Sequence, residues 1–151
     1  MNEKIGKKEK KVYISLYKKD AASYALILLA AVAEFVYVIS ILDSMPVSFW
    51  MGATVMVNIL LLFMLFTCAV KVNAYHKGWA ALTLALGFYT IFRQLVLVPY
   101  LLKPFDRETV ILIANLIQAG LLSWGGVTSL KKIKRRSALE KRIAAEKEQM
   151  G

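Results

Sequence analysis

Residues 28–40 read LLAAVAEFVYVIS, an apolar run with one carboxylate, Glu34, in its middle. The other twelve side chains are apolar, aromatic or small. The apolar character extends from position 21 to position 42, and a helix needs about 20 such residues to cross a bilayer. The stretch therefore predicts a transmembrane helix, and it raises the question of what neutralises Glu34.

Three further segments have the same length and apolar character, in a chain that is 58% hydrophobic. The four predicted spans cover residues of about 21–42, 47–70, 79–102 and 109–130. The connections DSMP, KVNAYHKG and KPFDRE are short, so consecutive helices must run antiparallel as neighbours. The predicted fold class is all-α: a polytopic membrane protein whose domain, residues 21–130, is a four-helix transmembrane bundle with up-down-up-down topology.

Lysine and arginine are distributed unevenly around these spans. Of the 20, 17 lie in the two tails and the loop between spans two and three, and only Lys103 and Arg107 lie in the other loops. Cytoplasmic segments carry the excess of Lys and Arg in membrane proteins. This bias predicts a multi-pass protein of the plasma membrane (cell membrane) with cytoplasmic N and C termini.

Both tails are basic and flank apolar runs, as expected of segments that rest on anionic lipid headgroups. Residues 1–20 form a juxtamembrane segment, and residues 131–151 are predicted to continue the fourth helix because they contain strong helix formers and no breaker. The net charge of +10 does not indicate nucleic acid, because no nucleic-acid-binding motif is visible. We expect headgroup contacts from Lys10, Lys11, Lys18, Lys19, Lys131, Lys132, Lys134, Arg135 and Arg136.

The remaining arginine, Arg93, offers an answer for Glu34. Glu34 lies eight residues before the outer end of span one, and Arg93 lies nine residues before that of span three. At about 1.5 Å per residue, both are roughly 12–14 Å below the outer boundary. An isolated charge there costs about 2.5–3.5 kcal/mol even on permissive scales, whereas an Arg–carboxylate pair cancels much of that cost. The sequence predicts that Glu34 and Arg93 meet.

Other polar side chains fall at a similar depth, so that each span contributes to one level. We call this predicted set the polar layer: Glu34, Arg93, Asn58, Gln94, Asn115, Gln118, Tyr37 and Tyr89. Buried polar contacts hold helices together in lipid, which makes a structural role the leading interpretation. A functional role is the alternative, because intramembrane ionisable groups mark ion and substrate routes. A third possibility is that either charge faces a neighbouring subunit.

The sequence does not favour an enzyme. It contains no Ser–His–Asp or Cys–His set, no HExxH motif and no glycine-rich phosphate loop. Cys68 is the single cysteine and His76 the single histidine, so neither a metal site nor a disulfide is predicted, and no cofactor is expected.

Ala33-Glu34-Phe35 is similar to the span-one motif of the small multidrug resistance family, four-span proteins with a proton-coupling glutamate. The resemblance implies transport with Glu34 as the coupling group. It covers only these residues. The long basic tails, the strong inside bias and Arg93 depart from that family's minimal tails and near-balanced charge, so no family is assigned.

The sequence thus favours a non-enzymatic integral membrane protein, a subunit or accessory factor of a larger membrane assembly of the transport type. Its expected partners are the bilayer and other membrane subunits or further copies of itself. The alternative is a homo-oligomeric proton-coupled small-molecule transporter, or an ion-conducting pore, that uses Glu34.

Overall fold

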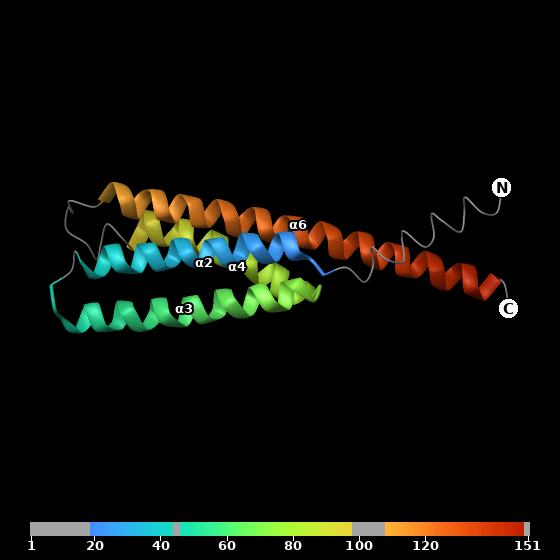
Figure 1. Ribbon diagram of the computed structural model, residues 1–151, viewed down its shortest axis with the longest axis horizontal. Coiled ribbons are helices and arrows are strands. Elements are labelled where there is room, and N and C mark those ends of the chain that lie inside the picture. Colours follow the sequence, from blue (N-terminus) through green and yellow to red (C-terminus); the bar gives the residue numbers. More distant parts are fainter. Residues whose placement is uncertain (1–18, 44–45, 98–107, 150–151) are drawn as a thin grey trace.

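The computed structural model describes residues 19–43, 46–97 and 108–149, and these parts of the chain are helical apart from short turns. The elements are α2 (Ala21–Leu42), α3 (Phe49–Asn73), α4 (Lys77–Phe92), the π-helix η1 (Arg93–Leu97) and α6 (Glu108–Gln149). The four α-helices pack as a bundle, and the C-terminal part of α6 extends beyond the other helices (Figure 1). The all-α prediction is confirmed.

Three of these helices are long and apolar enough to cross a membrane: α2, α3 and the segment Thr109–Arg142 of α6. The fourth, α4, has 16 residues and continues directly into η1, so residues 77–97 are helical without interruption. The predicted third span reaches further, to residue 102, and its last five residues lie outside the described part of the chain. Helix α6 runs unbroken to Gln149, well past the end of the predicted fourth span at residue 130.

Local signals explain where the helices begin and turn. The carboxylate of Asp20 accepts a hydrogen bond from the backbone N–H of Ser23 and so caps α2, and Ser48 caps α3 in the same way. Between α3 and α4, Tyr75 has a φ of 63°, a left-handed conformation that lets the chain reverse within three residues. This tight turn makes α3 and α4 antiparallel.

Helix α6 lies between α2 and α4 and packs closely on both. A Cβ atom added to Gly126 would lie 2.6 Å from Cγ of Leu84 on α4. On the other side, a Cβ atom on Gly125 would lie 3.4 Å from a side-chain carbon of Ile27 on α2. Small residues allow such close approach of helices in lipid, where no hydrophobic drive holds them together. The two adjacent glycines therefore serve two different helix interfaces.

Helix α3 is peripheral. It packs along α2 and touches α4 more sparsely, and its buried side chains are confined to a narrow stripe. Its remaining surface is apolar and exposed, as suits contact with lipid or with another membrane helix. The large exposed side chains of α3 include Met56, Leu60, Phe63, Phe66 and Val70.

Candidate functional site

Arg93 and Glu34 form a two-pronged ion pair between α4–η1 and α2. Nη1 of Arg93 donates to Oε1 of Glu34 over 2.7 Å, and Nη2 donates to Oε2 over 2.8 Å. Glu34 is fully buried and Arg93 is 4% exposed. Two parallel charge-assisted hydrogen bonds of this kind fix the geometry as well as the charge balance. The contact predicted from the depth of the two residues is present.

Three amide side chains complete the surroundings of the guanidinium. Asn58 on α3 accepts from Nη1 of Arg93 over 3.0 Å. From α6, Asn115 and Gln118 accept from Nη2 over 2.6 and 3.2 Å. All three amides are buried, and each turns its side-chain oxygen to Arg93. A single arginine thus joins α2, α3 and α6 to the helix that carries it.

Two of these amides are themselves held in place. The side-chain nitrogen of Asn115 donates to Oε1 of Gln94 over 2.5 Å, which ties α6 to η1 a second time. The side-chain nitrogen of Asn58 donates to the carbonyl oxygen of Thr54, one turn earlier on its own helix. Each amide therefore has its oxygen on Arg93 and its nitrogen on a second acceptor, so its orientation is fixed from both ends.

The two tyrosines of the predicted layer take different positions. The guanidinium carbon of Arg93 lies 3.8 Å from the ring centroid of Tyr37, a cation–π contact on a buried ring. Tyr89 is half-buried on α4 and lies near enough to interact electrostatically with Arg93 and Tyr37, but the described contacts show no hydrogen bond or ring contact between it and Arg93. Tyr37 therefore touches Arg93 directly, while Tyr89 acts on it only at a distance.

The π-helix begins at Arg93 itself. A π-turn inserts an extra residue into the helical ladder and redirects the side chains on either side of it. Here the adjacent residues Arg93 and Gln94 both reach polar partners, on α2 and on α6.

The charges of the site are internally compensated. Arg93 carries a positive charge, Glu34 a negative one, and the amides and the Tyr37 ring supply only dipoles and a π-face. Among the described polar atoms of the layer, Nε of Arg93 is the buried donor without a hydrogen-bond acceptor. Both carboxylate oxygens of Glu34 are bound to Arg93. Chemically, the arrangement can hold the four helices in one register.

A second charged contact, which was not predicted, lies at the other end of the bundle. Nζ of Lys132 on α6 lies 2.5 Å from Oδ1 of Asp20, the residue that caps α2. Asp20 is 2% exposed. An Asp directly before a long apolar run is a recognisable N-cap signal, but nothing in the sequence indicates that its carboxylate would also bind a lysine from the tail.

The predicted headgroup residues divide into three groups. Lys10, Lys11 and Lys18 lie outside the described residues. Lys132 and Arg136 have partners within the protein: Asp20 for the first, and both Glu140 and the Tyr75 ring for the second. The remaining side chains are exposed near the same end of the bundle: Lys19, Lys131, Lys134 and Arg135.

No family model, no curated protein and no solved structure matches this chain. The functional interpretation therefore depends on the geometry of the polar layer and on the distribution of charge.

Proposed function

We propose that this chain crosses a membrane four times, with both termini in the cytoplasm, and serves as a non-catalytic subunit or accessory factor of a larger membrane assembly. The polar layer acts as its structural clasp. The observation that carries the proposal is the two-pronged Glu34–Arg93 pair, in which both oxygens of the only carboxylate within the spans are bound to the arginine.

The length of the α4–η1 segment supports a fourth crossing. Residues 77–97 are helical, and at about 1.5 Å per residue they extend roughly 30 Å, the thickness of a bilayer's hydrocarbon core. At the end of the bundle where α2 begins, Asp20 binds Lys132, and Arg136 lies over the Tyr75 ring. The basic residues at this end support our placing of both termini in the cytoplasm.

The burial of Glu34 and its contacts with Arg93 favour a structural role over proton coupling. A carboxylate that carries protons must exchange them with water, directly or through a relay. Glu34 is fully buried, and its partner is an arginine that keeps its own charge. Both of its carboxylate oxygens are bound to Arg93, as expected of a group that holds helices together.

The exposed apolar surface of α3 supports a role within an assembly. Because α3 is bound on one side only, it offers a long helix face to lipid or to a partner helix. The chain has no soluble domain among its described residues in which another activity would be housed.

Purification of the tagged, full-length protein from its native membrane in a mild detergent tests the proposal. We expect a stoichiometric membrane partner to copurify. Recovery of the chain alone, together with proton-dependent uptake into vesicles that Glu34→Gln abolishes, would contradict the proposal and establish a transporter.

Orientation is tested separately with an impermeant maleimide. Cys68 is first replaced by alanine, and single cysteines are introduced as Val47→Cys, an exposed residue before α3, and Ser137→Cys, an exposed residue in the tail. Val47→Cys should react in intact cells, and Ser137→Cys should react only after permeabilisation. The reverse pattern would place the termini outside.

A further inference from the structure

In the part of α6 that follows Leu130, five exposed basic side chains lie along one side of the helix. At about 100° per residue, these positions share about a third of the helix circumference, and every one of them is exposed. No aspartate or glutamate falls in this arc. We call the set the basic stripe: Lys131, Lys134, Arg135, Ala138, Lys141, Arg142 and Ala145.

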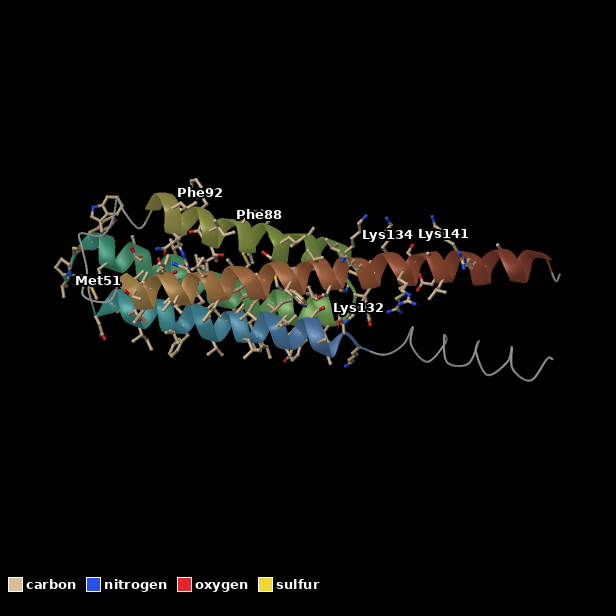
Figure 2. The ribbon with its side chains drawn as sticks, turned by 90° about the horizontal axis from the view of Figure 1, so that it is seen from above. Met51, Phe88, Phe92, Lys132, Lys134 and Lys141 are labelled. Atoms are coloured by element: carbon tan, nitrogen blue, oxygen red, sulfur yellow. The ribbon has the colours of Figure 1, made fainter. Side chains whose placement is uncertain are left out.

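The opposite side of the same segment is tied to the bundle. Ile133 packs against the apolar core, Lys132 binds Asp20, and the guanidinium carbon of Arg136 lies 4.8 Å from the ring centroid of Tyr75. Figure 2 shows Lys134 and Lys141 projecting from one side of α6 and Lys132 from the other. These contacts hold the first turns of the segment in line with the rest of α6, so the basic stripe points away from the protein.

Lipid headgroups reach only the first half of the basic stripe. The headgroup region extends about 5–8 Å beyond each face of the hydrocarbon core. Lys141 and Arg142 follow Leu130 by 11 and 12 residues, which places them roughly 16–18 Å along the helix axis. They therefore lie roughly 8–13 Å beyond the headgroups, about one screening length at physiological salt or more. The charge of the lipid reaches the distal cations only weakly.

The basic stripe has a seven-residue repeat. Lys134 and Lys141 form one edge, Arg135 and Arg142 form the other, and Ala138 and Ala145 lie between them. Small residues along the centre of a helix face allow a second helix to approach, and charges along the edges select its sign and register. This is the pattern of a helix-binding surface rather than of a randomly charged tail.

We propose that the basic stripe docks an acidic amphipathic helix of a cytoplasmic partner protein, with carboxylates along both edges of that helix. Two other possible occupants of the basic stripe belong to this chain or to a second copy of it, and their charge excludes them. Residues 1–20 contain seven lysines and would be repelled, as would the basic stripe of a second copy. The proposal rests on the proposed function for its orientation, in which residues 131–149 lie in the cytoplasm.

The test uses the full-length protein in nanodiscs of zwitterionic phosphatidylcholine. The probe is a fluorescent three-heptad helical peptide of Glu, Ala and Leu, with Glu on both edges of an Ala/Leu seam. A second peptide with Lys in place of every Glu is the control ligand. We expect the acidic peptide to bind, with an affinity that falls as salt rises, and the basic peptide not to bind.

Two double variants locate the binding. Lys141→Glu/Arg142→Glu reverses the distal part of the basic stripe and should weaken the acidic peptide at least roughly tenfold. Lys71→Glu/Lys77→Glu makes the same change in net charge at two exposed residues off the stripe, and should change affinity by less than about twofold. An equal loss in both variants would overturn the proposal, because it would reflect net charge alone.

Two further results would also overturn it. If a single-stranded RNA oligomer binds more tightly than the acidic peptide and responds to the same variant, the occupant is nucleic acid. If anionic phosphatidylserine in the nanodisc abolishes peptide binding, the basic stripe rests on the membrane. Both faces of a nanodisc are open to the probe, so this outcome is independent of the maleimide experiment, which tests orientation.

Discussion

The two halves of the bundle are held together by different means. In the half that contains the polar layer, Arg93 is surrounded by a carboxylate, three amides and an aromatic ring, and directional polar contacts join the helices. In the other half, which we call the apolar half, the core includes Ile27, Leu65 and Leu122, and glycines bring α6 close to its neighbours. The charged contact of the apolar half lies at its edge, where Asp20 meets Lys132.

We expect the two ion pairs to contribute differently to the stability of the bundle, because they differ in burial rather than in charge. The Glu34–Arg93 pair is closed to solvent on both sides, whereas the side chain of Lys132 is 44% exposed. Loss of one partner in the first pair strands a charge in the membrane. Asp20 is itself buried, but the Lys132 side chain that covers it faces solvent, so removal of that side chain lets water and other cations reach the carboxylate. The four predictions below test this contrast from the largest expected effect to the smallest.

Arg93→Leu should have the largest effect. It leaves the Glu34 carboxylate buried without a counter-charge, which costs about 3–5 kcal/mol in the free energy of unfolding. Unfolding in mixed detergent micelles, followed by circular dichroism, measures the change. Leu95→Ala is the control, because Leu95 is 71% exposed on the same π-helix and should lose little. Equal losses at the two positions would show that the polar contacts of Arg93 add nothing.

Asn115→Leu should have the next largest effect. It removes an acceptor of Arg93 and the donor to Gln94 while the ion pair itself remains, so we expect a loss of about 1–3 kcal/mol. Leu116→Ala, at an exposed neighbouring position on α6, provides the comparison in the same unfolding assay. A loss smaller than that of the comparison variant would argue that the amides merely fill space.

Gly126→Ala tests the packing of the apolar half. The added methyl group would lie 2.6 Å from Cγ and 3.2 Å from the backbone N of Leu84, so the Leu84 side chain must turn away or α4 and α6 must move apart. Overpacking of this kind costs about 1–3 kcal/mol, and the higher helix propensity of alanine offsets up to about 1 kcal/mol. Gly120→Ala meets nothing within 4 Å and should be neutral or stabilising. If both variants gain stability, the close approach at Gly126 does not contribute to packing.

Lys132→Ala should have the smallest effect, below about 1 kcal/mol, because the partly exposed ion pair is screened and the truncation lets water reach the Asp20 carboxylate. Asp20→Ala should cost more, about 0.5–2 kcal/mol, since it also removes the N-cap of α2. Thermal unfolding of both variants at low and high salt separates the two contributions. A salt-independent loss in Lys132→Ala would contradict the screened-pair interpretation.

The position of the polar residues along the helix axes could be predicted from the sequence. The direction in which each helix presents them could not. A fixed rise per residue and a fixed membrane thickness bring Glu34 and Arg93 to one level by counting alone. Which way a helix faces is harder to predict when it is apolar all around its circumference. Tyr37 and Tyr89 are each one turn from a charged residue, yet only the Tyr37 ring contacts Arg93.

Two other features could not be predicted from the sequence, for a similar reason. The peripheral position of α3 depends on how the helices pack, and its composition resembles that of the other spans. The Asp20–Lys132 contact joins residues 112 positions apart, and only the continuation of α6 past the membrane boundary brings them together. Two residues that are far apart in the sequence leave no local pattern that would indicate their contact.

A double-mutant cycle on Glu34 and Arg93 tests the central claim most directly. Glu34→Leu and Arg93→Leu should each destabilise the bundle by about 3–5 kcal/mol, because each strands the other charge. The double variant removes both charges, and its stability should return to within about 1–2 kcal/mol of the unmodified protein. Two losses that simply add in the double variant would show that the residues do not neutralise one another.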